Sequence, residues 1–180
     1  RLAGVIYLTD GSGSHPPGTP HLRSVRRREA RRATSRLATH AAPIDWLGWE
    51  DGRPHATGSL PFRHTARRIA AILSQRRVDA LAVSDPGDAH CDHVAAFEVA
   101  AASCAAACRK VQIFTYSVWG EPSTCGLPVR TSAIPQGQRR GALAAHRSQL
   151  SPALGEGFRL PSGMRRMRAC DTLRAVDWPR

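Results

Sequence analysis

The chain has 180 residues, of which 26 are lysine or arginine and 14 are aspartate or glutamate, so its formal net charge is +12. This length is sufficient for one domain with a buried core, and the 42% of hydrophobic residues is typical of a globular protein rather than of a disordered or collagen-like chain. No apolar run approaches the roughly 20 residues that a membrane-spanning helix requires, so we expect no membrane span.

Positive charge is concentrated in two stretches of the chain. Residues 21–36 hold seven arginines and one glutamate, and residues 158–180 hold six arginines and two aspartates. One hypothesis is therefore a non-enzymatic basic α/β domain that binds nucleic acid or another polyanion. The alternative is a solvated helix face and a basic tail without a ligand. Aromatic residues make up only 6% of the chain and do not alternate with basic ones, which argues against nucleic acid as a partner.

The cysteines indicate a reducing environment. The chain has five of them, an odd number, with no CxxC pair and no secretory signal at the start of the sequence. We therefore expect free thiols and a cytoplasmic location.

Strands and helices alternate along the sequence. An apolar strand at residues 2–8 runs into a Gly/Ser loop, and a helix with an apolar stripe follows at residues 22–38. The further expected elements are strands at 43–49, 78–84 and 111–119, and helices at 65–77, 92–109 and about 139–150, with Thr65 as an N-cap. This order predicts an α/β fold with a parallel sheet and helices on both faces. We expect a domain over residues 1–159 and a basic, poorly ordered tail over residues 160–180.

The stretch from Gly87 to His93 contains the most reactive side chains. Ligands of such folds bind outside the carboxyl ends of the strands, and this stretch follows a predicted buried strand. His90 and His93 are three residues apart at a helix start, so both imidazoles can reach one site, and Asp92 could orient a ring or cap the helix. Neutral imidazole is a common zinc ligand, often with a carboxylate on its other nitrogen. The alternative is a set of polar loop residues and helix caps.

Five motifs in a fixed order carry a resemblance to a known family. The motifs TDGSGSHP, RRREA, WLGxxDG, GDxHxDHxAA and AHRSQ, which lie between about Gly4 and Arg159, resemble those of the PIG-L/LmbE-like deacetylases. These enzymes are zinc-dependent amidases that remove acetyl groups from N-acetylglucosamine-type substrates. The resemblance implies a Rossmann-like fold, a Zn²⁺ cofactor and a small-molecule amino-sugar or related N-acyl substrate.

The resemblance also implies roles for individual residues. His93 would be a zinc ligand, and His90 would stabilise or protonate the tetrahedral intermediate. Asp92 would be the carboxylate partner of a histidine. Arg26 matches an arginine that holds the sugar, and Asp51 matches an acidic loop residue near the substrate.

The sequence departs from the family pattern in two places. Cys91 stands where the family has proline, which adds a soft potential ligand. The His-Pro-Asp-Asp-Glu motif, which supplies two zinc ligands and the general base, does not occur in the chain. We therefore expect the chain to lack the family's first strand and half of its metal site, and to be impaired as it stands. His15 is an alternative ligand, and for His146 a structural and a catalytic role are both open.

Overall fold

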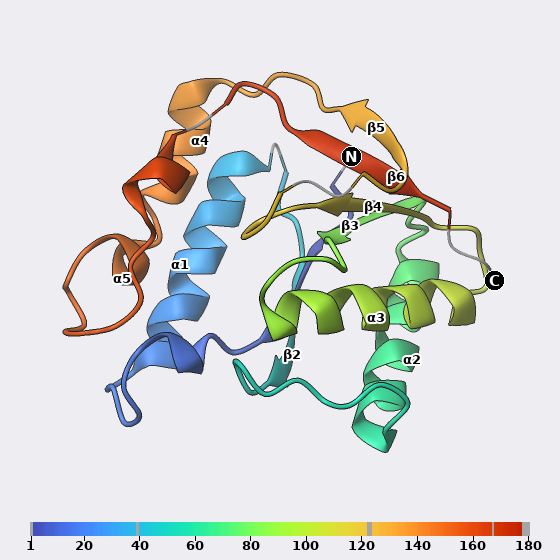
Figure 1. The fold of residues 1–180 in the computed structure, drawn as a ribbon, viewed down its shortest axis with the longest axis horizontal. Helices are drawn as coiled ribbons and strands as arrows, with labels where there is room; N and C mark the ends of the chain where they lie inside the picture. The colour runs from blue at the N-terminus through green and yellow to red at the C-terminus, as the bar shows by residue number, and fades with distance from the viewer. Residues whose placement is uncertain (1, 39, 122–123, 167, 178–180) are drawn as a thin grey trace. The chain divides into compact units, whose positions relative to one another are not determined.

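The computed structural model describes residues 2–38, 40–121, 124–166 and 168–177 (Figure 1). The chain divides into two units, each built from segments that are separated in the sequence. Unit 1 comprises Arg1–Asp51 and Ser132–Cys170, and unit 2 comprises Gly52–Thr131 and Asp171–Arg180. No helix among the described residues is long and apolar enough to cross a membrane.

Unit 1 combines a pair of parallel strands with three α-helices. Strand β1 pairs with β2, and Tyr7 lies opposite Trp46, with the two rings stacked at 4.5 Å between centroids. The Arg27 guanidinium lies 5.2 Å from the centre of the Trp46 ring, a cation–π contact. The elements are β1 (Val5–Thr9), η1 (Ser12–Ser14), α1 (Leu22–Leu37), β2 (Ile44–Trp49), α4 (Gln136–Leu143), α5 (Arg147–Leu150) and η2 (Ser162–Arg165).

Helix α1 packs against α4 and α5, which Figure 1 shows beside it. Small side chains allow the close approach, since Ala33 forms a buried cluster with Ala142 and Ala145. Glu29 lies on the same side of α1 and is only 5% exposed. Its Oε1 accepts a hydrogen bond from the Ser148 backbone N–H at 2.8 Å, and its Oε2 accepts one from Ser148 Oγ at 2.6 Å. A buried carboxylate therefore fixes α5 to α1.

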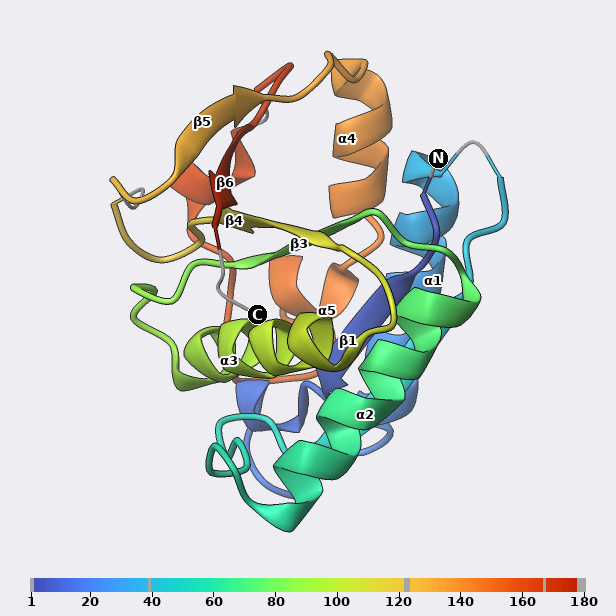
Figure 2. The same ribbon diagram turned by 90° about the vertical axis from the view of Figure 1, so that its right-hand side faces the viewer.

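Unit 2 contains a mixed sheet with the strand order β3-β4-β6-β5. Strands β3 and β4 are parallel, and β6 runs antiparallel to both β4 and β5. Helices α2 and α3 pack against each other, as Figure 2 shows, and α3 also contacts β3. The elements are α2 (Leu60–Gln75), β3 (Ala80–Ser84), α3 (Cys91–Ala106), β4 (Gln112–Tyr116), β5 (Leu127–Arg130) and β6 (Thr172–Val176). The core of the unit comprises Val83, Phe97, Ala100, Ala101 and Ile113.

The predicted α/β class is confirmed, and the expected strands and helices of the first 116 residues are present with shifted ends. Helix α2 begins at Leu60 rather than at Thr65, because Ser59 caps it by accepting a hydrogen bond from the Phe62 N–H and proline occupies its first turn. The helix expected at 139–150 is divided into α4 and α5, with His146 between them.

The expectation of a poorly ordered tail is wrong for residues 172–176, which form β6. This strand lies between β4 and β5, so its backbone hydrogen-bonding groups are paired on both sides. Of the same predicted tail, residues 167 and 178–180 lie outside the described residues. The domain boundary at residue 159 stays a prediction.

Replacement of Glu29 by alanine should destabilise unit 1. The substitution leaves the buried Ser148 N–H and Oγ without their acceptors, at a cost of about 3 kcal/mol in the free energy of unfolding. Thermal unfolding followed by circular dichroism should show a Tm lower by roughly 6–12 °C. Glu156→Ala, which removes an exposed carboxylate from the same unit, is the control and should leave the Tm unchanged. Equal Tm values for the two variants would contradict a stabilising role of the Glu29–Ser148 contact.

Candidate functional site

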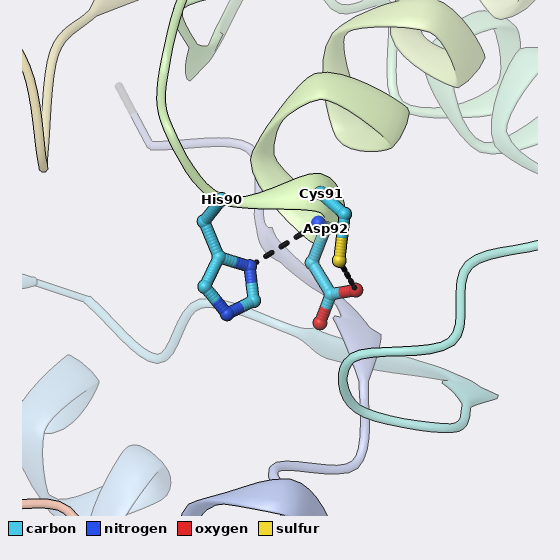
Figure 3. Close-up of side chains that lie close together, drawn as sticks. All are labelled: His90, Cys91 and Asp92. Carbon is cyan, nitrogen blue, oxygen red and sulfur yellow. Dashed lines mark hydrogen bonds between the residues drawn. The ribbon is translucent and has the colours of Figure 1, made fainter.

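His90 caps the N-terminus of α3 in unit 2 (Figure 3). Its backbone is extended, and its Nδ1 accepts a hydrogen bond from the Asp92 N–H at 3.2 Å. A nitrogen that accepts a hydrogen bond carries no proton, so the neutral ring holds its proton on Nε2. The capping contact therefore makes the Nε2–H of His90 a hydrogen-bond donor.

Asp92 is buried at the start of the same helix. Its Oδ2 accepts a hydrogen bond from the Gly52 N–H at 3.0 Å, and its Oδ1 lies 3.7 Å from the Cys91 thiol (Figure 3). Partial burial and the neighbouring Asp92 carboxylate raise the pKa of the Cys91 thiol, which keeps this exposed group protonated at neutral pH. Asp92 thus holds the turn at Gly52 against the beginning of α3.

His93 lies beside a different carboxylate, that of Asp88. Its buried Nδ1 is 3.2 Å from Asp88 Oδ1, in an orientation that falls short of hydrogen-bond geometry. Because a carboxylate only accepts, this contact favours the tautomer with the proton on Nδ1 and leaves Nε2 free to bind a ligand. The ring centroids of His90 and His93 are 5.1 Å apart. The carboxylate beside His93 is thus that of Asp88, whereas the Asp92 carboxylate contacts Gly52 and Cys91, and the role expected for Asp92 stays a prediction.

Asp88 is held by backbone donors from the segment that follows β4. Its Oδ2 accepts hydrogen bonds from the Val118 N–H at 2.9 Å and the Trp119 N–H at 3.2 Å. Burial alone would raise the pKa of Asp88, but these two hydrogen bonds and the nearby His93 lower it below its ordinary value. Sequence reasoning did not select Asp88, although its place two residues before His90 was a usable signal.

The side chains at the start of α3 suit a metal ion by their chemistry. His90, Cys91 and Asp92 each offer one ligand atom, and these atoms lie within 4.8 Å of one another. Imidazole nitrogen, thiolate sulfur and carboxylate oxygen are the ligand types of zinc. Two of the three groups are already occupied, because His90 Nδ1 caps the helix and Asp92 Oδ2 accepts from Gly52. His93, with its Nδ1 beside a carboxylate and its Nε2 free, has the arrangement of a ligating histidine.

In unit 1, the loop after β1 is held by Asp51. The Asp51 carboxylate accepts hydrogen bonds from the Gly13 N–H at 3.0 Å and from Thr9 Oγ1 at 3.4 Å. Gly11 in this loop has φ +70°, and a Cβ there would lie 3.0 Å from Arg26 Nε. Glycine is therefore favoured by the backbone conformation, and a larger residue would also crowd the guanidinium.

Arg26 is half-buried against this loop in unit 1, and its Nη1 donates to Ser14 Oγ at 3.4 Å. Burial lowers the pKa of the Arg26 guanidinium, and Asp51, Glu29 and Tyr7 oppose this effect. The structure thus brings the two predicted substrate-binding residues, Arg26 and Asp51, to the same loop.

His15 does not have the environment of a metal ligand. The ring is 5% exposed, its Nδ1 lies 3.0 Å from Ser14 Oγ, and its Nε2 lies 3.4 Å from Arg159 Nη1. Since arginine can only donate, His15 Nε2 is the acceptor and its Nδ1 carries the proton. Burial and the positive charges of Arg159 and Arg26 lower the pKa of His15. The alternative that His15 replaces a missing ligand is therefore not supported, because both ring nitrogens are occupied.

His146 is half-buried between α4 and α5. Burial lowers the pKa of its imidazole, and the nearby Glu29 carboxylate opposes this shift. Its position between the two helices is compatible with a structural role and with a catalytic one, and both stay open.

Comparisons with known proteins point to one family. The family model described as PIG-L, GlcNAc-PI de-N-acetylase, matches residues 3–104, which is more than half of the chain. The solved structure of the conserved protein TT1542 from Thermus thermophilus is 26% identical, with a TM-score of 0.61, and the match covers 81% of this chain and 66% of that one. A comparison with curated proteins gave no significant match.

A second solved structure shares the fold. It is the N,N'-diacetylchitobiose deacetylase from Pyrococcus horikoshii, with 20% identity and a TM-score of 0.61 over 83% of this chain and 61% of that one. The present chain therefore spans at most about two thirds of the length of either neighbour.

Replacement of Asp88 by asparagine should destabilise unit 2 at neutral pH. Asparagine keeps one acceptor for the backbone donors but turns an NH₂ group toward His93, so we expect a loss of about 2 kcal/mol. Because the folded pKa of Asp88 is lowered, its stabilising effect is present above the ordinary pKa of aspartate and is lost as the pH falls through the folded pKa. Urea unfolding at several pH values should show a difference between the variant and the unmodified protein that is constant near neutrality and shrinks below about pH 4. A difference that does not depend on pH would argue against this role of the Asp88 charge.

Proposed function

The chain belongs to the PIG-L family, and from this membership we propose that it is a deacetylase domain. The proposed reaction is hydrolysis of the N-acetyl amide of an N-acetylglucosamine-type small molecule with the help of Zn²⁺. The observation that carries the proposal is the pair of histidines at the start of α3, which lies within the matched residues. The contacts of their Nδ1 atoms favour a proton on Nε2 in His90 and on Nδ1 in His93. The shared fold of the Pyrococcus horikoshii deacetylase is compatible with it.

His93 is the residue proposed to hold the metal, through its Nε2. The buried Nδ1 without an aligned hydrogen bond, next to the Asp88 carboxylate, fits a ligating histidine with an acidic partner. When bound, Zn²⁺ supplies polarisation of the amide carbonyl and a water of lowered pKa.

His90 is proposed to act on the reacting atoms. Its Nε2–H can donate to the carbonyl oxygen as negative charge develops there, because Nδ1 is occupied by the helix cap. The same imidazole can deliver a proton to the leaving amine. Asp92, assigned to catalysis by resemblance, would support this chemistry by its backbone N–H on His90 and its carboxylate on Gly52.

Arg26 and Asp51 of unit 1 are the proposed sugar-binding residues. A guanidinium donates to hydroxyl oxygens, and a carboxylate accepts from hydroxyl groups, so both suit a sugar. Asp51 already accepts from Gly13 and Thr9, and these contacts hold its carboxylate in one orientation. The division into a deacetylase domain over residues 1–159 and a basic segment over 160–180 is part of the same proposal, as is a cytoplasmic location.

The proposal predicts distinct effects for the two histidines. Acetate release from N-acetylglucosamine and from N,N'-diacetylchitobiose should be measured with added zinc, together with the zinc content of the protein. Because the motif that supplies two further ligands and the general base does not occur in the chain, we expect weak zinc binding and a low rate before any substitution. His93→Ala should lose the remaining zinc and activity, whereas His90→Ala should keep that zinc while the remaining rate falls further.

His64→Ala is the matched control, because His64 is an exposed histidine of α2 in the same unit. It should change neither zinc content nor rate. Acetate release that does not depend on zinc, or that is unaffected by both site variants, would contradict the proposal.

Cys91→Pro tests whether the thiol takes part in metal binding. Cys91 is the first residue of α3, where proline is favoured, and the preceding His90 has φ −96° and ψ 128°, which suits a residue before proline. We expect a stability gain of about 0.5 kcal/mol, measured by urea unfolding, and an unchanged zinc content, because the proposed zinc ligand is His93 and not the thiol. A loss of zinc in this variant would instead identify Cys91 as a ligand.

A further inference from the structure

Two adjoining cavities lie along helix α1 in unit 1. Their volumes are about 330 and 630 Å³, within the usual range for small-molecule sites. Val25, Arg28, Ala153 and Leu154 line both cavities, so the two share a wall. We call this space the arginine groove and define it by Val25, Arg28, Arg32, Arg147, Ala153 and Leu154.

Three guanidinium groups from two elements line the groove. Arg28 and Arg32 are one turn apart on α1, and Arg147 begins α5, which packs beside α1 (Figure 1). All three are exposed, and none makes a side-chain ion pair or hydrogen bond with another described residue. Because three positively charged side chains line one cavity, an anion bound there would be attracted by all of them.

The one carboxylate that lines these cavities, among the described residues, forms no ion pair with Arg28, Arg32 or Arg147. Glu29 is the acidic residue in their lining, and both of its oxygens are taken by Ser148. Its side chain is only 5% exposed and anchors α5. The three arginines therefore remain available to an external ligand.

The wall that carries Arg147 is fixed in place. Besides the contact with Glu29, Arg159 Nη1 donates to the Ser148 carbonyl at 3.4 Å, and the Leu160 N–H donates to the Gln149 carbonyl at 2.9 Å. A ligand would thus meet a preformed site and would not have to order this segment.

We propose that the arginine groove binds the phosphate group of a small organic phosphate. The fork of donors on each guanidinium matches phosphate oxygens, and three such groups suit a dianion with several acceptors. The side chains of Val25 and Leu154 offer an apolar surface for the organic part beside the phosphate. This proposal does not depend on the deacetylase activity, because none of its three arginines is placed in the reaction.

Isothermal titration calorimetry with inorganic phosphate and with phenyl phosphate tests the proposal. In a phosphate-free buffer of low ionic strength, both should bind at one site per chain, and phenyl phosphate should bind more tightly. Arg32→Gln and Arg147→Gln should each weaken both ligands about tenfold, the effect of losing one charge-assisted contact. Arg31→Gln is the matched control, since Arg31 is exposed on the same helix and does not line the groove; it should change the affinity less than twofold.

A further variant tests the contact with the organic part of the ligand separately from the contact with its phosphate. Leu154→Ser should remove the advantage of phenyl phosphate over inorganic phosphate and leave the affinity for inorganic phosphate unchanged. Circular dichroism melts of all variants check that they are folded. The proposal is overturned if neither ligand binds saturably, or if Arg31→Gln weakens binding as much as Arg32→Gln, which would indicate a general charge effect. Binding of duplex DNA or of anionic vesicles without binding of either phosphate would overturn it as well.

Discussion

Buried carboxylates need hydrogen-bond donors for both oxygens, and this requirement organises each unit of the protein. In unit 1, Glu29 receives two donors from Ser148 and so attaches α5 to α1. In unit 2, Asp88 lies beside His93 and accepts hydrogen bonds from two backbone N–H groups after β4. Asp92 accepts one from the Gly52 N–H at the start of α3. Each of these hydrogen bonds joins segments at least 30 residues apart. The groups that shape the candidate sites are thus also groups that hold the fold together.

The same local structure gives two neighbouring histidines different chemistry. His90 accepts a backbone hydrogen bond through Nδ1, whereas His93 turns its Nδ1 toward a carboxylate. The first ring therefore presents a proton at Nε2 and the second presents a lone pair. A hydrolytic site needs both a hydrogen-bond donor for developing negative charge and a ligand for an electrophile. Backbone capping and one buried acid are thus enough to give opposite tautomers to two rings 5.1 Å apart.

Local sequence patterns predicted most of the elements, because apolar residues that face the core recur with the period of the helix or strand that carries them. The apolar run that forms β1, the stripe on α1 that includes Ala33, and the histidine pair at the start of α3 were all visible in this way. Strand β6 was not, because five residues with little periodicity become a strand only by pairing with β4 and β5.

The role of Asp88, a single side chain, could not be predicted from local periodicity either. Its role depends on the Val118 and Trp119 N–H groups, 30 and 31 residues away in the sequence. The occupied nitrogens of His15 likewise depend on Arg159, which lies 144 residues further along the chain. Contacts of this kind are set by the tertiary fold and leave no periodic signal. The start of α2 was missed for a different reason, since Ser59 and Thr65 are both plausible caps and only the observed hydrogen bond distinguishes them.

The division of unit 1 between two distant segments also has a consequence during protein synthesis. When α1 leaves the ribosome, the partner of Glu29 has not yet been made, because Ser148 lies 119 residues later. At ordinary translation speeds of about 5–20 residues per second, the carboxylate must wait on the order of 10 s for its donors. Meanwhile the first segment of unit 2, residues 52–131, is completed in between. The carboxylate of Glu29 thus stays hydrated on the packing face of an arginine-rich helix until Ser148 has emerged.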